Sequence, residues 1–314
     1  MDNKEILVSI QCLVYNQEPY LRQCLDGFVM QKTNFRFEAI VHDDVSTDGS
    51  AAIIREYADK YPDIIKPIYE TENQYSKQDG SLRRIVNSAC KGKYIAFCEG
   101  DDYWMDPLKL QKQVDFLEAN PDYGMVYGKV RVYNQTENKY EKRVFGEFSN
   151  GYEDLMTKGN AVPTLTVVCR SLLLKNFSNE ITKRWKMGDY PLWLYISLKS
   201  KIHFMNDFFG VYRKLLHSAS SRDNYEAVKS FFKSAKDCKD FFNDRYGSGL
   251  KNEIEDRFKK RMFLCAFTYK KWDEALKWYK LGFEKNYKDR IRCFFVRYRF
   301  LHKIGSYFID KQIM

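Results

Sequence analysis

The sequence predicts an α/β fold with a mostly parallel sheet flanked by helices, followed by a basic helical region. Three observations lead to this prediction. Short apolar segments alternate with segments of helical periodicity through residue 132. Acidic clusters directly follow two of the apolar segments. The net charge of +10 lies wholly in the C-terminal third.

The segments expected to be strands share continuous apolar runs bounded by turn residues, and they are 6–14, 37–42, 64–69, 94–98, 123–132 and 163–169. The segments expected to be helices carry apolar residues at helical spacing, and they are 20–31, the stretch opening at Ser50, 81–90, the stretch after Pro107, and 192–198. Strands that alternate with helices form crossover units, so most strands are expected to run parallel. Ligands of such sheets bind at the carboxyl ends of the strands.

The charge distribution indicates a boundary near residue 220. Residues 224–314 hold 22 Lys and Arg against 12 Asp and Glu, whereas the preceding residues are neutral overall. We therefore expect a first domain over 1–220. A basic, aromatic-rich helical region is expected over 221–314.

Cysteine usage and hydropathy favour a cytoplasmic protein. The 8 cysteines are scattered without CxxC spacing, as expected of reduced structural residues. No run reaches the ~20 apolar residues of a membrane span, and the start lacks a cleavage site. The basic C-terminal region could still lie peripherally on an anionic membrane surface at the inner face of the cell membrane.

Glu99, Asp101 and Asp102 form an acidic cluster at the end of a predicted strand. Carboxylates crowded in this way repel one another unless a cation lies among them, and Mn²⁺ and Mg²⁺ prefer carboxylate oxygens. Asp43 and Asp44 end another strand and could accept a hydrogen bond from a nucleobase. Helix capping remains the alternative function of both clusters.

For two further positions, the surrounding sequence does not decide between a functional and a structural role. Arg83 lies near the start of a predicted helix, where its guanidinium could bind phosphate or belong to a solvated face. Asp189 precedes another predicted helix among aromatic residues and reads locally as an N-cap.

The ordered motifs resemble those of the family 2 inverting glycosyltransferases, which have the GT-A (Rossmann-like) fold. The matching segments are Val8 to Asn16, Val41 to Gly49, Gly92 to Trp104, Met105 to Leu110, Met187 to Asp189 and Val211 to Arg213. The resemblance covers about residues 5–220, and it implies that the domain expected over 1–220 is a nucleotide-sugar-binding and catalytic domain. Several motifs in the family's order are more specific than any one of them.

The resemblance implies a role for each candidate residue. The residues implied to contact the donor nucleotide are Leu13, Tyr15, Glu18, Asp43, Asp44, Arg83, Asp101 and His217. Asp44 would bond the uracil or thymine ring with Asp43 beside it. Glu99, Asp101 and Asp102 would form the DXD-type motif, with Asp101 nearer the ribose and Asp102 on the Mn²⁺ or Mg²⁺ ion. Asp189 would be the general base, and the segments Met187 to Asp189 and Val211 to Arg213 would lie on the acceptor side.

The resemblance therefore implies a metal-dependent transferase that moves a sugar from a nucleotide-sugar donor, UDP-linked by expectation, to a glycan or lipid-linked saccharide acceptor. The setting it implies is bacterial surface-polysaccharide assembly. A nucleotidyltransferase acting on sugar phosphates is the first alternative. A basic nucleic-acid-binding protein ranks third, because the sequence contains no recognised nucleic-acid motif. We therefore expect no nucleic-acid partner.

Overall fold

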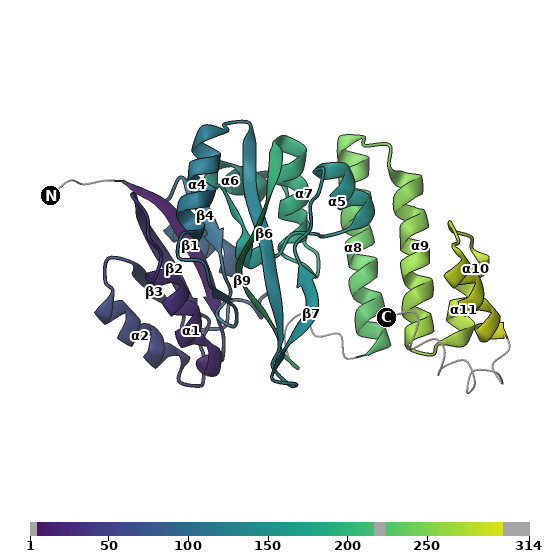
Figure 1. Cartoon of the computed structure of the whole chain (residues 1–314), viewed down its shortest axis with the longest axis horizontal. Helices are drawn as coiled ribbons and strands as arrows, with labels where there is room; N and C mark the ends of the chain where they lie inside the picture. The colour runs from purple at the N-terminus through teal and green to yellow at the C-terminus, as the bar shows by residue number, and fades with distance from the viewer. Residues whose placement is uncertain (1–4, 217–223, 298–314) are drawn as a thin grey trace. The chain divides into compact units, whose positions relative to one another are not determined.

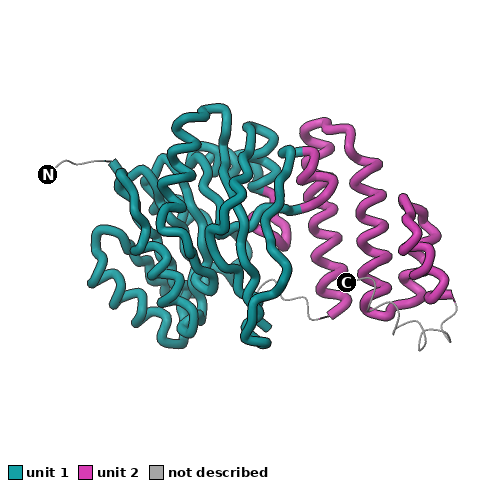
Figure 2. The backbone as a smooth tube through the Cα atoms, in the orientation of Figure 1, with its two compact units in different colours: residues 1–152, 160–183, 192–218 teal, residues 153–159, 184–191, 219–314 magenta. Residues whose placement is uncertain are grey.

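The computed structural model describes residues 5–216 and 224–297. The chain divides into two compact units (Figure 2). The first comprises 1–152, 160–183 and 192–218, and the second 153–159, 184–191 and 219–314. The long C-terminal segment of the second unit starts at Ala219, and two short internal stretches join it.

The first unit is built on a nine-stranded sheet (Figure 1). Its strands are β1 (Ile6–Val14), β2 (Arg36–Asp43), β3 (Ile65–Tyr69), β4 (Tyr94–Phe97), β5 (Tyr103–Trp104), β6 (Tyr123–Asn134), β7 (Lys139–Phe145), β8 (Val168–Arg170) and β9 (Lys201–Lys214). The spatial order is β3-β2-β1-β4-β8-β6-β9-β5, with β7 paired to β6. The expected α/β fold with a mostly parallel sheet is confirmed in the four strands β3, β2, β1 and β4, which pair in parallel.

The register of these parallel strands brings their carboxyl ends to one edge of the sheet. Val14 at the end of β1 pairs with Asp43 at the end of β2, and Gln11 pairs with Phe97 at the end of β4. The inward side chains Val8 and Ile10 are fully buried. The apolar runs of the sequence thus build the core, and the polar residues that follow them meet beyond it.

The helices of the first unit connect the strands, and they are α1 (Glu18–Val29), α2 (Ser50–Lys60), α3 (Ser81–Ala89), α4 (Lys109–Ala119), α6 (Ser171–Glu180) and most of α7 (Tyr190–Lys199). Helices α1 and α2 contact each other, because Arg22 forms two hydrogen bonds with Glu56 of 2.7 and 2.6 Å. The Tyr57 hydroxyl also donates to Asp26 at 2.6 Å.

The second unit contains α5 (Tyr152–Lys158) almost entirely, with α8 (Tyr225–Tyr246), α9 (Lys251–Thr268), α10 (Trp272–Lys280) and α11 (Tyr287–Arg297). The Asn224 side chain caps α8 by accepting from the Ala227 N–H at 2.9 Å. Helix α8 ends at Gly247, whose φ of 66° suits glycine. Phe263 and Ala275 lie in an apolar core of this unit.

Two sequence expectations need correction. The segment 163–169 forms a 3-10 turn (Thr164–Thr166) before the short strand β8, because the Thr166 hydroxyl donates to the Pro163 carbonyl at 2.8 Å and closes the turn. The strand β9, 14 residues long, was not expected. It pairs in parallel with β6, far away in the sequence.

Candidate active site

The loops after β1 and β2 are joined by side chain to backbone hydrogen bonds. The Ser46 hydroxyl accepts from the Asn16 N–H at 3.0 Å, and the Ser50 hydroxyl accepts from the Gln17 N–H at 2.9 Å. In return, the Asn16 side-chain oxygen accepts from the Thr47 N–H at 2.7 Å. The turn residues of both motifs therefore serve to hold the two loops together.

Asp44 is a buried loop anchor. Its side chain is 3% exposed, and its two oxygens accept from the backbone N–H groups of Gln74 at 2.6 Å and Tyr75 at 2.9 Å. Its own N–H bonds the Val14 carbonyl at 2.9 Å. The loop after β3 is thus fixed against the end of β1.

The Asp43 side chain makes fewer and longer hydrogen bonds than that of Asp44. Its Oδ1 accepts from the Ser46 N–H at the long distance of 3.3 Å, and the residue is 4% exposed. Between the two acids and Ser46, Val45 adopts a φ of 66°, which is strained for a β-branched residue. Such strain is often found at functional sites.

The segment after β4, which carries the second acidic cluster, continues alongside β1. The Cys98 N–H bonds the Gln11 carbonyl and the Gly100 N–H bonds the Leu13 carbonyl, both at 3.1 Å. A Cβ at Gly100 would overlap the Gln17 side-chain oxygen and lie 3.1 Å from Val14, so a larger residue here would have to displace these side chains. Both acidic clusters are therefore attached to the last residues of β1.

The carboxylates of the second cluster interact electrostatically. Burial raises the pKa of Asp102 well above its usual range, and the charges of Asp101 and Glu99 raise it further. Burial also raises the pKa of Asp101, and the nearby Arg213 guanidinium opposes the shift. Crowded, desolvated carboxylates are stabilised by a cation.

The three acids are not equally placed to hold that cation. Asp102 is 4% exposed, and its Oδ1 accepts from the Arg213 backbone N–H at 2.8 Å. Among the described residues, no group of three or more His, Cys, Asp or Glu side chains is arranged to hold a metal ion. One or two carboxylates still fit Mg²⁺ or Mn²⁺, because such ions commonly take their other ligands from substrate phosphates and water.

The remaining donor-side candidates are spread around the loops. Tyr15 is 52% exposed and Leu13 is half-buried. The Glu18 carboxylate accepts from the Gly49 N–H at 2.8 Å, so it joins the two loops. Arg83 lies half-buried in the first turn of α3. His217 lies outside the described residues.

Asp189 lies in the second unit, directly before α7. It is half-buried, and its Oδ1 accepts from the Tyr190 N–H at 2.7 Å. This contact is compatible with a helix-terminal role and leaves its proposed role as general base a prediction.

Sequence reasoning missed the residues around Arg213. The resemblance places Val211 to Arg213 on the acceptor side without a role for Arg213 itself, and the structure shows that Arg213 is 9% exposed and that its backbone N–H donates to Asp102. Its side chain contacts residues of α1, of β5, and of the end of β6 and the residue after it. The match of Val211 to Arg213 to a motif of the family was the signal that pointed to this region.

The chain is similar to known proteins in sequence and in fold. The family model described as "Glycosyl transferase family 2" matches residues 9–179. An uncharacterized protein of Mycobacterium tuberculosis (strain H37Rv) is 46% identical over 125 residues, which are 40% of this chain. That match spans 35% of the relative, so the chain covers about a third of the length of its mycobacterial relatives.

Other relatives match over most of their length. A protein of Escherichia coli named a UDP-Glc:α-D-GlcNAc-diphosphoundecaprenol β-1,3-glucosyltransferase is 26% identical over 226 residues, 72% of this chain and 83% of the relative. Among solved structures, Staphylococcus aureus TarS 1–349 with UDP-GlcNAc has a TM-score of 0.54 at 17% identity, covering 84% of this chain and 82% of that one.

A mannosyltransferase of Pyrobaculum calidifontis with GDP-Man and Mn²⁺ has a TM-score of 0.58 at 15% identity. The superposition covers 96% of this chain and 87% of that one. These similarities confirm the GT-A fold. Because the family model matches more than half of the chain, including both acidic motifs, this chain belongs to glycosyl transferase family 2.

Proposed function

We propose that the protein is a metal-dependent inverting glycosyltransferase that moves a sugar from a nucleoside-diphosphate sugar to a hydroxyl group. The observation that carries the proposal is the attachment of both acidic clusters to the end of β1. Asp44 bonds Val14 and Gly100 bonds Leu13, so a base-binding carboxylate pair and a metal-binding motif flank one strand end. The family match and the named relatives give no support to the nucleotidyltransferase or nucleic-acid alternatives.

Asp43 is proposed to bind the nucleobase. Because both oxygens of Asp44 are occupied by the Gln74 and Tyr75 N–H groups, Asp44 is assigned to holding the loop. Asp43 keeps more accepting capacity, since within the described ranges its side chain accepts only the long hydrogen bond from Ser46. This arrangement refines the resemblance, which gave the base to Asp44 first.

Asp101 and Glu99 are proposed to hold Mn²⁺ or Mg²⁺, and Asp102, on which the resemblance puts the ion, is proposed to hold these ligands in place. Asp102 already accepts the Arg213 N–H and is almost fully buried. The ion, when bound, would neutralise the negative charge that develops on the leaving diphosphate. The carboxylates would supply its protein ligands.

Asp189 is proposed to take the proton from the acceptor hydroxyl. An inverting displacement needs no protein nucleophile, but it needs a base on the face opposite the leaving group. A carboxylate in a segment separate from the metal motif meets that need. Asp189→Asn keeps the helix-terminal acceptor oxygen and removes the proton acceptor, so turnover should fall by about 10²–10⁴ with donor affinity unchanged.

The donor and acceptor classes follow from the relatives. One solved relative binds UDP-GlcNAc, and the E. coli relative is named for a UDP-glucose donor and a diphosphoundecaprenol-linked acceptor. We therefore propose a UDP-linked donor and a glycan or lipid-linked saccharide acceptor for this chain.

A panel of nucleotide sugars, assayed for donor hydrolysis with and without a chelator, tests the proposal. Wild type should hydrolyse a UDP-sugar only with Mn²⁺ or Mg²⁺, and Asp101→Asn should lose nearly all activity. Full activity in chelator would refute metal dependence. Absence of hydrolysis and of binding for every nucleotide sugar would refute the donor assignment.

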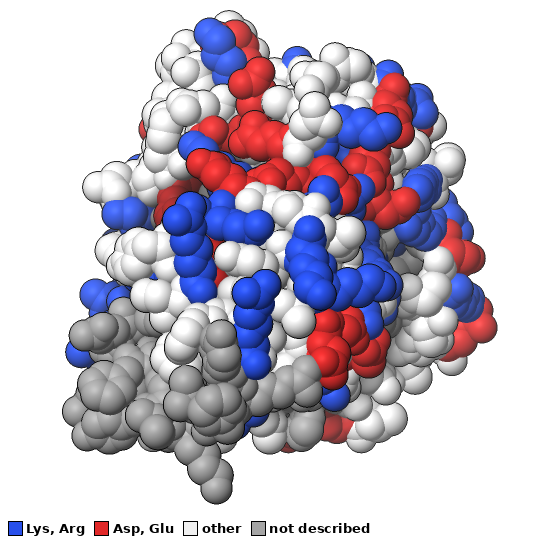
Figure 3. Space-filling model, turned by 90° about the vertical axis from the view of Figure 1, so that its right-hand side faces the viewer, with Lys and Arg blue, Asp and Glu red and all other residues white. Residues whose placement is uncertain are grey.

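Contact of the C-terminal unit with an anionic membrane surface is a second proposal. Helix α11 exposes Tyr287, Ile291 and Phe294 by 67%, 43% and 50%, and basic residues neighbour them. The face drawn in Figure 3 intersperses Lys and Arg with a band of Asp and Glu. No described helix has the length and apolar character needed to cross a bilayer. Flotation with anionic vesicles should show salt-sensitive association, and no association at low salt would end this proposal.

A further inference from the structure

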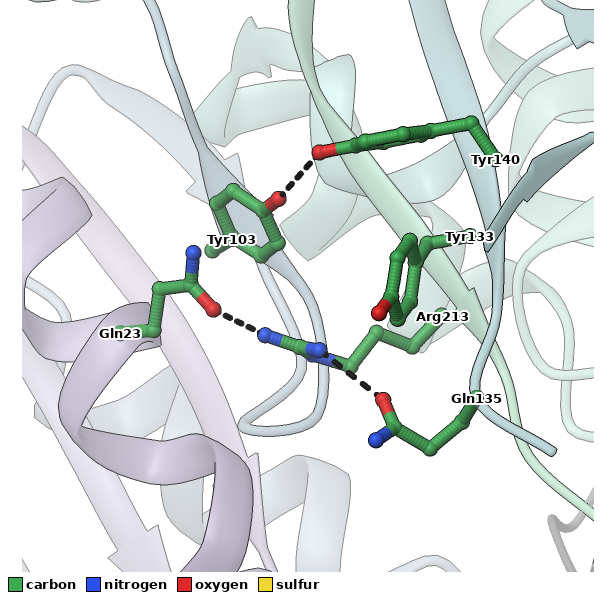
Figure 4. A pocket seen from close by; sticks show the side chains of 6 residues that line it. All are labelled: Gln23, Tyr103, Tyr133, Gln135, Tyr140 and Arg213. Carbon is green, nitrogen blue, oxygen red and sulfur yellow. Dashed lines mark hydrogen bonds between the residues drawn. The ribbon is translucent and has the colours of Figure 1, made fainter. Parts of the chain in front are cut away.

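A polar pocket of the first unit lies next to the metal motif (Figure 4). It measures about 220 Å³ and is lined by Gln23, Tyr103, Tyr133, Gln135, Tyr140 and Arg213. These residues come from α1, β5, the end of β6 and the residue after it, β7 and β9. The Arg213 backbone binds Asp102, so the wall of the pocket is joined directly to the acidic motif.

Arg213 is the centre of the pocket. Its guanidinium donates to the Gln135 side-chain oxygen at 3.1 Å and to that of Gln23. The ring centroids of Tyr103 and Tyr133 lie 4.9 and 5.9 Å from its Cζ. Its Nε is buried and has no hydrogen-bond partner among the described residues.

The charge of Arg213 lacks a direct counterion. Within the described ranges it makes no ion pair with an acidic side chain, and no carboxylate lines the pocket. Asp101 and Asp102 act on it electrostatically, but a bound metal ion would compensate their charge. A guanidinium that is 9% exposed and has no carboxylate at ion-pair distance is costly to bury, so a bound anion would stabilise it.

The other lining groups add donors. Gln23 and Gln135 direct their oxygens to the guanidinium, and Figure 4 shows the Gln23 amide nitrogen turned toward Tyr103. The Tyr103 and Tyr140 hydroxyls share one hydrogen bond of 3.1 Å, which uses only one of their two protons. Amide and hydroxyl protons around a guanidinium match the oxygens of a phosphate or carboxylate.

The strand order places the pocket on the acceptor side. The base-binding carboxylates end β2, and the metal motif follows β4. Four of the lining residues lie in β5, β6, β7 and β9, on the other side of β4 from β2 in the sheet order. A donor whose base lies at β2 and whose diphosphate lies at the metal motif leaves this pocket to the second substrate.

We propose that the Arg213 pocket binds an anionic group, a phosphate or a carboxylate, of the acceptor. The proposal rests on the proposed glycosyltransferase function and names the chemistry of its second substrate. A lipid-linked diphosphate and an acidic sugar would both supply such a group.

Calorimetric binding of two probes tests the proposal, with UDP and Mg²⁺ saturating so that the donor phosphate site is filled. The probes are geranyl diphosphate and glucuronate. Binding of the first alone identifies a phosphate and binding of the second alone a carboxylate, and either result or both supports an anion subsite. Failure of wild type to bind either probe at millimolar concentration overturns the proposal.

Gln23→Glu is the decisive variant. Gln23 is exposed on α1, and the new carboxylate would pair with Arg213 and occupy the anion's place. We expect probe affinity to fall roughly tenfold or more, with thermal stability unchanged or higher. Tyr140→Phe, at a position 48% exposed, should weaken binding less by removing one rim hydroxyl.

Lys32→Gln is the matched control, because it changes the net charge by the same amount at an exposed position outside the pocket. It should bind both probes as wild type does. Unchanged probe affinity in Gln23→Glu would show that the pocket is a structural connection only. UDP binding, measured separately, tells this failure from a failure of the proposed function: a protein that binds UDP but neither probe refutes only the subsite.

Discussion

Replacing Asp44 by asparagine separates the two acids at the end of β2. In the wild type, two backbone N–H groups, from Gln74 and Tyr75, donate to the two Asp44 oxygens at 2.6 and 2.9 Å. Asparagine keeps one acceptor oxygen and places an NH₂ group against the other N–H. Because one charge-assisted bond is lost and a buried donor loses its partner, we expect about 2–4 kcal/mol less stability for this loop.

Hydrogen exchange measures that loss directly. A change of this size should speed exchange of the amides in residues 70–80 by roughly 30-fold or more. The matched variant Asp43→Asn should leave this loop protected, because Asp43 accepts only the long bond from Ser46. It should instead weaken UDP binding by about 1.5–3 kcal/mol, the range for a hydrogen bond to a charged group.

Two results would refute this reasoning. Wild-type exchange of residues 70–80 in Asp44→Asn would show that the carboxylate does not hold the loop. Wild-type UDP affinity in Asp43→Asn, measured by calorimetry, would show that the acid pair only caps local backbone.

Three further substitutions test the fold around the site by urea unfolding. Burial lowers the pKa of Lys109 to about 7. Between pH 7 and 10 the unfolded chain therefore binds a proton that the folded protein lacks. As a result, this group makes the free energy of unfolding rise with pH by up to about 1.4 kcal/mol per pH unit. Lys109→Met should therefore be more stable than wild type at pH 7, with a difference that shrinks toward pH 10; a constant difference would contradict the shift. Val45→Gly should leave stability unchanged or raise it by about 1 kcal/mol, because it relieves a φ of 66°, and a clear loss would mean that the Val45 side chain is needed. Arg170→Lys should cost about 2–4 kcal/mol, because Arg170 donates to three backbone carbonyl groups and a tyrosine hydroxyl; wild-type stability would show that lysine replaces these bonds.

The parallel half of the sheet could be predicted from the sequence because each of its strands is a continuous apolar segment bounded by turn residues. The segments 6–14 and 37–42 are continuous apolar runs ending in turn residues, and both became strands with nearly these bounds. Strand β9 does not have a continuous apolar segment of this kind. Its residues 205–208 are partly or fully exposed and polar residues interrupt it, and its partner β6 lies about 70 residues earlier in the chain.

The candidate site was predictable to a similar extent. The acidic clusters were recognised because parallel strands bring their carboxyl ends to one edge. The role of Asp44 as a loop anchor was not, because its partners are the backbone N–H groups of Gln74 and Tyr75, which no side chain encodes. The Arg213 pocket combines residues from 23 to 213, an association that only tertiary structure reveals.

The stereochemistry of donor cleavage tests the central claim most directly. An α-linked UDP-sugar, incubated with enzyme and Mg²⁺ or Mn²⁺ without acceptor, is hydrolysed by water from the face opposite the diphosphate if the enzyme inverts. Proton NMR at early times, before mutarotation, should show the β-anomer of the free sugar first, and Asp189→Asn should slow its release. First release of the α-anomer, or equal release by Asp189→Asn, would contradict an inverting transfer with Asp189 as its base.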